Sequence, residues 1–214
     1  SINNLRKLPI SERCVDIAFA DRYSFCIINS QSILQLTESK LSKLGEMFYN
    51  DTYLMDQNAC SSPHLILWVG DKADMAKEKF WKSVSLAVSE KYKIESIKVI
   101  DKYTLLCQDA IEEKVTTPIK KYYNYIYRIN LDSLPENLDS LRGKFGYFYE
   151  FNIDDINYMS HLINAKYQTL TYFGIDKSVL LDFVLKNCLS GIDRIVPIGQ
   201  ALDMSIIWDG YDIV

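Results

Sequence analysis

The most constraining feature of the sequence is an apolar run, Leu65-Ile66-Leu67-Trp68-Val69, which no polar residue interrupts. A strand with one wet face alternates apolar and polar residues, so an uninterrupted run predicts a strand that is covered on both faces. Strands of that kind belong to parallel sheets with helices packed on each side. The run therefore predicts a buried strand at the centre of the fold.

The segments on either side of this run have apolar residues at helical spacing. Thr37 can cap a helix that runs to about Tyr53. One face of this helix carries Leu41, Leu44, Met47 and Phe48. A second helix is expected from Asp71 to about Tyr92, and its apolar side is formed by Met75, Phe80, Val84, Ala87 and Val88. A third helix is favoured for residues 97–111, where the matching spacing is that of Ile97, Ile100, Thr104, Cys107 and Ile111.

Strands and helices alternate along the remaining sequence. Strands are expected at residues 14–20, 23–28, 123–129, 145–151, 168–173 and 193–197. Helices are expected at residues 154–164 and 176–189, and a connecting loop at 131–142. Strands that alternate with helices of about 10–15 residues predict a mostly parallel sheet covered on both faces. The predicted fold class is therefore α/β, with three layers around a mostly parallel sheet.

Composition narrows the classes of partner and site. With 24 basic and 28 acidic residues the net charge is −4, which does not suggest a nucleic-acid surface. No apolar run approaches the roughly 20 residues of a membrane span, and the N-terminus is too polar for a signal peptide. Five cysteines without a CxxC pair and two histidines indicate neither a disulfide framework nor a metal site. The simplest interpretation is a cytoplasmic protein with reduced thiols.

Cys60 is the strongest candidate for a reacting group. It follows a predicted helix and precedes the apolar run, in a polar loop that contains Gln57, Asn58 and Ser61. Loops at strand ends commonly carry reacting groups, and polar neighbours with free backbone N–H groups can stabilise a thiolate and an oxyanion. The alternative is a buried structural thiol, because free cysteine is among the most buried residues. The other cysteines lie in apolar patterns and are expected in the core: Cys14, Cys26, Cys107 and Cys188.

The string Asp56-Gln57-Asn58-Ala59-Cys60-Ser61-Ser62-Pro63 resembles the nucleophile segment of the acyl-CoA reductases related to LuxC, the fatty-acid reductase subunit of bacterial bioluminescence. That family lies within the aldehyde dehydrogenase superfamily. Further segments match in the same order: 21–25, 167–170, 191–199 and Trp208-Asp209-Gly210. The resemblance implies the fold of an aldehyde dehydrogenase catalytic domain, with Cys60 as the nucleophile and Gln57, Asn58 and Ser61 in its supporting loop.

The resemblance also implies a reaction and partners. A fatty acyl-CoA, or an acyl-protein thioester, would be reduced to an aldehyde with NADPH, through an acyl-enzyme on Cys60. The Cys60 backbone N–H would help to hold the oxyanion. Acyltransferase or acyl-protein synthetase subunits, or further copies of the chain, are the protein partners that the resemblance implies.

Two departures from the superfamily pattern concern its glutamates. Residues 19–24 stand where aldehyde dehydrogenases have Glu-Leu-Gly-Gly-Lys, and they contain no Glu. A reductase should lack that water-activating base, and Asp21 is expected to be a turn residue. Gly143-Lys144-Phe145-Gly146 replaces the cofactor-binding Glu-x-Phe-Gly string. Glu150 is expected inside a strand and receives no cofactor role.

The sequence also contains no Gly-rich phosphate loop. Residues 1–214 are therefore expected to be the catalytic domain of a longer protein, with the dinucleotide-binding domain outside this chain. The cofactor-contacting residues are not identified. The chain alone is expected to bind NADPH weakly or not at all, and to be inactive in the full reaction.

Alternatives to this interpretation are a non-catalytic assembly domain of the same fold and a cofactor-free cysteine acyltransferase or esterase. His64 is four residues from Cys60, but in an extended segment that offset separates them by about 13 Å. A surface or strand-end histidine is expected there, and His161 is expected on the polar side of its helix. The Trp208-Asp209-Gly210 segment would form a turn near the active site or a subunit contact. Cys60 itself is expected at the rim of the sheet, in a concave surface.

Overall fold

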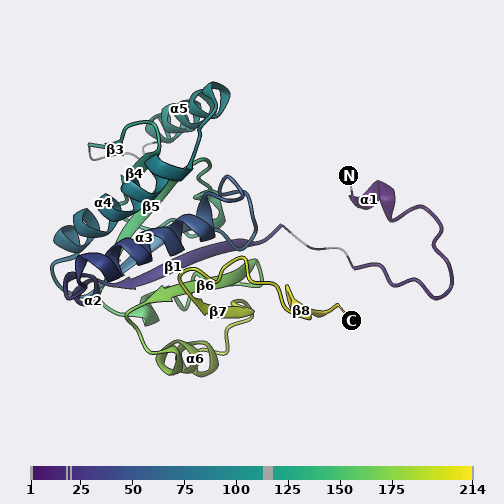
Figure 1. Ribbon diagram of the computed structural model, residues 1–214. Helices are drawn as coiled ribbons and strands as arrows, with labels where there is room; N and C mark the ends of the chain where they lie inside the picture. The colour runs from purple at the N-terminus through teal and green to yellow at the C-terminus, as the bar shows by residue number, and fades with distance from the viewer. Residues whose placement is uncertain (1, 18, 20, 113–117, 214) are drawn as a thin grey trace.

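The sheet has seven strands in the order β3-β4-β5-β2-β1-β6-β7. The structure is a computed structural model, and it describes residues 2–17, 19, 21–112 and 118–213 (Figure 1). The strands are β1 (Tyr23–Asn29), β2 (Pro63–Val69), β3 (Lys120–Tyr122), β4 (Ile126–Asn130), β5 (Tyr147–Ile153), β6 (Tyr167–Phe173) and β7 (Arg194–Pro197). All neighbouring strands are parallel except β3, which is antiparallel to β4. The mostly parallel sheet is confirmed.

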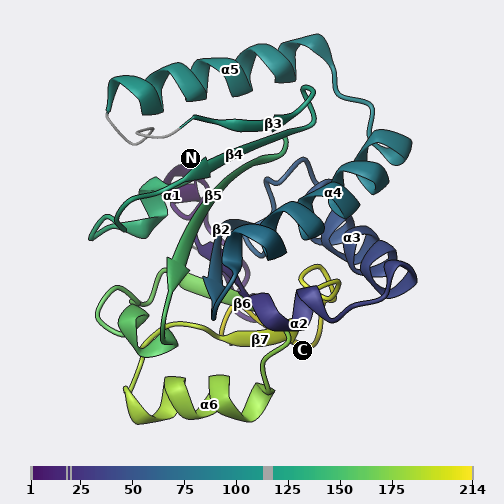
Figure 2. The ribbon, with the colours of Figure 1, turned by 90° about the vertical axis from the view of Figure 1, so that its left-hand side faces the viewer.

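Helices cover both faces of this sheet, as the two perpendicular views show (Figures 1 and 2). One face packs against α2 (Ser30–Leu34), α3 (Glu38–Thr52) and α4 (Ala73–Lys91). The other face packs against α5 (Ser96–Ile111) and α6 (Lys177–Lys186). The three-layer α/β architecture is therefore confirmed. The short helix α1 (Ile2–Leu5) lies outside this body, at the end of an extended N-terminal arm (Figure 1).

Strand β2 occupies the middle of the sheet, between β5 and β1. Leu65 and Leu67 belong to the core under α5 and α6, and Ile66 and Trp68 belong to the core under α3 and α4. All four side chains are fully buried. Both faces of the strand that the apolar run forms are therefore covered, as predicted.

Helix α3 begins and packs as its sequence predicts. The Thr37 side chain accepts a hydrogen bond from the Lys40 N–H, which caps the first turn. Gly45 lets α3 approach α4 closely, because a Cβ at this position would lie 2.7 Å from the Ser83 Oγ. In α4 the predicted apolar side is buried except at Met75, which is exposed.

Helix α5 is confirmed, but its orientation was not anticipated. The apolar residues whose spacing predicted the helix are exposed, including Ile97, Ile100 and Ile111. The buried side contains Lys102, Leu106 and Asp109. Lys102 faces inward because its Nζ donates to the backbone carbonyls of residues 124, 125 and 145. The side of α5 that faces the sheet therefore carries the Lys102 amine, which is bonded to three carbonyls, and the predicted apolar residues face solvent.

Two predicted elements are wrong. Residues 14–17 and 19 form no strand, and residues 18 and 20 lie outside the described part of the chain. Residues 154–164 form turns and a 3₁₀ helix, η2 (Ile156–Met159), instead of an α-helix. The Asp155 carboxylate binds the backbone N–H and the side-chain amide of Asn157, and such local bonds compete with helix formation.

The predicted loop at 131–142 is confirmed, with one 3₁₀ turn, η1 (Leu138–Ser140). A small hairpin, β8 (Ile207–Trp208) and β9 (Tyr211–Asp212), was not predicted as strands. Among the described residues, no helix is both long enough and apolar enough to span a membrane.

Candidate active site

The candidate residues gather where the parallel strands begin. Cys60 is exposed in the turn that leads into β2. Arg22 immediately precedes β1, Gln168 is the second residue of β6, and Asp193 immediately precedes β7. Ligands of open parallel sheets usually bind at the opposite edge, outside the carboxyl ends of the strands. The Cys60 turn differs from that rule, because it lies at the amino edge of the sheet.

The turn from α3 to Cys60 has an unusual backbone. Asp56 and Gln57 are consecutive non-glycine residues with φ of 54° and 61°. Left-handed backbone at such residues persists only where the surroundings hold it. The Asp56 carboxylate accepts bonds from the Tyr92 hydroxyl and, at 2.9 Å, from the Lys98 Nζ. These contacts fix the first half of the turn against the ends of α4 and α5.

Gln57 fixes the second half. Its side chain is fully buried, and its Nε2 donates to the carbonyls of Pro63 (3.2 Å) and Tyr147 (3.0 Å). Its Oε1 accepts from the N–H groups of Gly146 and Tyr147 at 3.1 and 3.2 Å. One side chain thus links the Cys60 turn to the starts of β2 and β5. The Gln57 side chain thus holds the turn through four hydrogen bonds to backbone groups.

The other two supporting residues differ from Gln57. Asn58 is exposed, and its side-chain amide donates to the Asp56 carbonyl at 3.2 Å. Ser61 is buried beneath the turn. The backbone N–H groups of Ala59, Cys60 and Ser61 donate to no residue that the structure describes. The turn therefore presents an exposed thiol beside the N–H groups of Ala59 and Cys60, which could bind an oxyanion, whereas Ser61 is buried.

Ser24 is a site residue that sequence reasoning missed. Its side chain is fully buried in β1, and its Oγ donates to the Cys60 carbonyl at 2.6 Å. The same oxygen accepts from the Thr169 N–H at 3.1 Å. Ser24 thereby connects the Cys60 turn with β6. It lies within the 21–25 segment that resembles the reductases, but no property of the sequence distinguishes it there.

An ion cluster, here called the Arg22 cluster, consists of the buried residues Arg22, Gln168 and Asp209 and the exposed residue Asp193. The Arg22 guanidinium pairs with the Asp193 carboxylate and, at 2.8 Å, with the Asp209 carboxylate. It also donates to the Tyr167 carbonyl at 3.0 Å. The Gln168 Nε2 donates to Asp209 at 2.7 Å. The segments 21–25, 167–170, 191–199 and 208–210, predicted from separate parts of the sequence, meet at this cluster.

His64 lies at the start of β2, as predicted for a strand-end residue, but it is buried rather than on the surface. Its ring stacks on Tyr23, and its Nδ1 lies 3.1 Å from the Gly143 carbonyl. Burial and the nearby Arg142 charge lower the pKa of His64 to about 3. It is a neutral core imidazole. His161 is exposed, in a turn rather than on the expected helix.

The expected burial of the other cysteines is wrong for three of them. Cys26 is buried in β1, where burial raises the pKa of its thiol well above the ordinary value. Cys14, Cys107 and Cys188 are exposed. Cys107 is exposed because it lies on the outer side of α5, and Cys188 because it follows the end of α6. Exposure alone therefore does not distinguish Cys60.

Two acidic residues near the positions of the superfamily glutamates, Asp21 and Glu150, have structural contacts. Asp21 is exposed and pairs with Arg142 at 3.2 Å. Glu150 lies within β5, as predicted, and is buried. Its carboxylate accepts bonds from the indole N–H groups of Trp68 and Trp81 and from Arg128 at 2.9 Å. Glu150 and these three partners are here called the Glu150 cluster.

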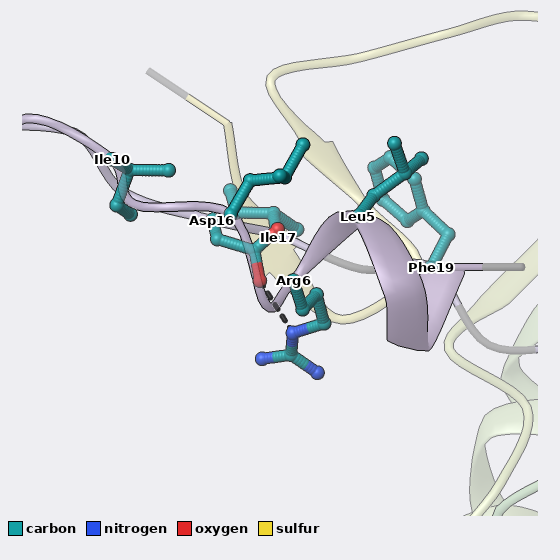
Figure 3. Close-up of a pocket in the computed structure, with 7 residues that line it drawn as sticks. Leu5, Arg6, Ile10, Asp16, Ile17 and Phe19 are labelled. Atoms are coloured by element: carbon teal, nitrogen blue, oxygen red, sulfur yellow. Dashed lines mark ion pairs between the residues drawn. The ribbon is translucent and has the colours of Figure 1, made fainter.

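Two cavities bear on ligand binding. A cavity of about 310 Å³ lies beside the Cys60 turn, and its lining residues are Asn58, Asp101, Lys102, Thr104, Leu105, Gln108, Arg142, Lys144 and Phe145. Ligand pockets range from about 300 to 1,000 Å³, so this cavity is at the small end. Burial lowers the pKa of Lys102 to about 7. Figure 3 shows the second cavity, of about 380 Å³, which the N-terminal arm forms around the Arg6–Asp16 ion pair.

Gly143 and Gly146 stand where close backbone packing requires glycine, since a Cβ would meet the carbonyls of Tyr147 and Tyr125 at 1.7 and 2.1 Å. The described residues include no Gly-rich loop at a helix start to hold a pyrophosphate. They also include no group of three or more His, Cys, Asp or Glu side chains placed to hold a metal ion.

The sequence pattern of the acyl-CoA reductase (LuxC) family matches residues 1–105. The resemblance noted above is thus confirmed for the part of the chain that contains Cys60. The segments 167–170, 191–199 and 208–210 lie outside the matched residues. No curated protein matches the sequence with significance.

Several solved structures have the same fold. An NAD-dependent aldehyde dehydrogenase from Sinorhizobium meliloti has a TM-score of 0.58 at 11% identity, over 91% of this chain and 40% of that one. A glyceraldehyde-3-phosphate dehydrogenase from Methanocaldococcus jannaschii, in complex with NADP, gives 0.54 at 15% over 86% and 41%. An NAD-dependent benzaldehyde dehydrogenase from Corynebacterium glutamicum gives 0.51 at 15% over 83% and 39%. The chain has the fold of an aldehyde dehydrogenase catalytic domain and spans about two fifths of these proteins.

Proposed function

We propose that Cys60 accepts an acyl group from an acyl thioester, as the acyl-transfer half of an acyl-CoA reductase. One observation carries the proposal. Cys60, which lies within the residues that match the family, is exposed on a turn that buried side chains support and in which its own N–H has no described partner. The family match and the aldehyde dehydrogenase fold support oxidoreductase chemistry on acyl-CoA or aldehydes.

The acyl transfer uses groups of this chain alone. The Cys60 thiolate attacks the carbonyl carbon of the thioester, a sulfur–carbon bond forms, and the carbonyl oxygen becomes an oxyanion. The free N–H groups of the turn, above all that of Cys60, bind this oxyanion. The bond to the departing thiol then breaks, and coenzyme A leaves as its thiolate. The product is a thioester on Cys60.

The second half of the proposed reaction needs a group that the described residues do not hold. In the longer protein, NADPH bound to a separate domain would supply the hydride that reduces the acyl-enzyme to an aldehyde. Residues 1–214 would then be the catalytic domain, active in acylation but not in reduction. Hydrolysis of the acyl-enzyme should be slow, because no carboxylate replaces the water-activating Glu: Asp21 is exposed and pairs with Arg142.

The same proposal specifies the acyl donor, the cellular location and the partners of the whole protein. The acyl donor would be a long-chain fatty acyl-CoA or an acyl-protein thioester, in the cytoplasm. An acyltransferase or an acyl-protein synthetase would be the partner that delivers it. Further copies of the chain would complete the assembly.

Acylation by a long-chain acyl-CoA tests the proposal. After incubation, mass spectrometry of peptides should find one acyl group at Cys60, and the Cys60→Ser variant should carry none. Cys107 and Cys188 are matched internal controls, because both are exposed thiols. Acylation of these two with Cys60 unmodified would contradict the proposal. Rapid release of free fatty acid would indicate an esterase instead. Calorimetry should show weak or no binding of NADPH to the chain.

A further inference from the structure

We propose that a cavity at the carboxyl edge of the sheet binds a small organic carboxylate, with Lys77 as the group that pairs with its charge. The cavity has a volume of about 340 Å³ and is lined by Asp74, Lys77, Pro118, Lys120, Arg128, Asn130 and Glu150. Ligand pockets range from about 300 to 1,000 Å³, so this volume suits a small molecule. The proposed site is separate from Cys60, which precedes β2 at the amino edge.

The position of the cavity is one that ligands of parallel sheets commonly occupy. Asn130 is the last residue of β4, and α4, which carries Lys77, begins shortly after β2 ends. Ligands of open parallel sheets usually bind outside the carboxyl ends of the strands. Three of the lining residues are almost fully buried and form the floor of the cavity: Lys77, Arg128 and Glu150. The other four are exposed and surround its opening.

Most charged groups around the cavity are paired. Glu150 accepts hydrogen bonds from Arg128 and from two indole N–H groups. Glu78, which lies next to Lys77 in α4, accepts from Lys120 at 2.7 Å and from Arg128 at 3.0 Å. These contacts set two carboxylates against two cations, and they do not include Lys77.

Lys77 has only a distant counter-ion. Its Nζ lies 3.9 Å from the Asp74 carboxylate, and the Asp74 side chain is 88% exposed, so water weakens this pair. Burial lowers the pKa of Lys77, although the charges of Glu150 and Asp74 act against this effect. Lysine is almost never buried to this extent without a partner. The floor of the cavity therefore has one positive charge in excess, and an anion would supply the missing counter-ion.

The same side chains also have hydrogen-bond donors to offer. An ammonium group has three N–H donors, and that of Lys77 uses one of them, toward the Asn130 Oδ1 at 2.8 Å. The Nδ2 of Asn130 donates to no residue that the structure describes. The Nη2 of Arg128 also has no described partner, because its contacts with Glu150 and Glu78 use Nε and Nη1. Donors from α4 and β4 thus line one cavity.

A carboxylate matches both the excess charge and the donors. It carries one negative charge, and its two oxygens together offer about four acceptor positions. A phosphate group carries about −1.5 to −2 charges near pH 7. It would therefore leave excess negative charge beside Glu150 and Asp74.

Thermal unfolding of the full chain with sodium butyrate tests the inference, and potassium chloride at equal ionic strength controls for screening. Butyrate at about ten times its dissociation constant should raise Tm by about 3–6 °C, because a ligand stabilises the state that binds it. The rise should saturate, and sodium phosphate at equal ionic strength should give a smaller one. An equal rise in chloride would overturn the inference, and an equal or larger rise in phosphate would overturn the assignment to a carboxylate.

Lys77→Met should abolish the butyrate effect. Without butyrate this variant should be at least as stable as the wild type, because methionine fills the space without a poorly paired charge. Lys77→Gln, which keeps a polar group beside Asn130, is a second variant and should also lose the effect. Lys82→Met is the matched control, because it removes an exposed lysine from the same helix, and it should keep the full effect. An undiminished butyrate effect in either Lys77 variant would overturn the inference.

Cys60→Ser separates this site from the proposed acyl-transfer site. The butyrate effect should persist in this variant, because Cys60 lies at the opposite edge of the sheet. Its loss would place butyrate at the Cys60 turn and overturn the inference. Failure of wild-type acylation at Cys60 would refute the proposed function and leave the butyrate result standing.

Discussion

The Arg22 cluster and the Glu150 cluster each bury an arginine against carboxylate, but they differ in what surrounds them. Glu150 receives two indole N–H groups and Arg128, so both of its oxygens are bonded within the sheet and α4. Asp209 is equally buried, but its Oδ2 has no partner among the described residues. The Arg22 cluster also continues, through Thr169 and Ser24, to the Cys60 turn. The two clusters therefore differ in that only the Arg22 cluster is connected to the backbone of Cys60, the proposed nucleophile.

The largest expected effect on stability is that of Glu150→Gln. The amide keeps the shape of the side chain, but its NH₂ group would face the Arg128 Nε or the indole donors. Breaking a buried ion pair in this way should lower the free energy of unfolding by about 3–5 kcal/mol. Denaturant titration measures the loss. The acylation rate of Cys60 in the folded fraction should not change, and a large decrease would remove the distinction between the clusters.

Asp209→Asn is the matched change in the other cluster. The new Nδ2 can occupy the place of the oxygen that lacks a described partner, so fewer bonds are lost. The free energy of unfolding should fall by about 1–3 kcal/mol, measured in the same titration. Acylation of Cys60 should slow in this variant, unlike in Glu150→Gln. If both variants lost only stability, the Arg22 cluster would be a structural feature like its counterpart.

Lowering the pH should decrease the free energy of unfolding through His64, which lies at the amino edge of the sheet. Its folded pKa of about 3 lies below the ordinary 6.5, so the unfolded chain binds this proton first as pH falls. The contribution of His64 is complete above about pH 6.5 and is lost toward pH 3, at about 1.4 kcal/mol per pH unit. His64→Phe keeps an aromatic ring against Tyr23 and should remove this slope from the unfolding free energy. An unchanged slope would mean that His64 can be protonated in the folded protein.

The titration of Asp51 should change the free energy of unfolding in the opposite direction. In the wild-type protein it should partly cancel the pH dependence that His64 produces. Burial raises the pKa of Asp51 to about 7, although its carboxylate accepts the N–H groups of Gly199 and Ala201. The folded chain therefore binds this proton first, and the contribution is present below about pH 4 and lost as pH rises to 7. Asp51→Asn should make the rise of stability from pH 4 to 6.5 steeper. Denaturation at several pH values should show this for Asp51→Asn and the reverse for His64→Phe.

Much of the fold could be predicted because its determinants are local. The apolar run of β2 and the capped, amphipathic α3 are properties of neighbouring residues. The 154–164 segment has a helical pattern, but the local bonds of Asp155 and burial of Ile156 and Met159 favour turns. The exposed face of α5 could not be predicted, because the three carbonyls that Lys102 satisfies come from other parts of the chain.

The candidate site also contains residues with local determinants and residues with long-range ones. Cys60 and Gln57 could be selected because the motif is continuous in sequence. Ser24 and the partners of Arg22 could not, because their contacts join residues 36 to 187 positions apart. Their roles exist only once the strands lie side by side. For Trp208-Asp209-Gly210 the sequence leaves open a turn near the active site or a subunit contact, and only the structure connects Asp209 to Arg22.

The two ends of the sheet have a consequence for how the protein behaves at high concentration. One edge strand, β3, has three residues and exposes Lys120 and Lys121. The other, β7, has four residues and ends in Pro197, which has no N–H to donate. Short, charged or proline-terminated edges resist edge-to-edge pairing, the contact through which sheets aggregate into fibres. Copies of this chain that associate should therefore meet through helices and loops, and not by extending the sheet.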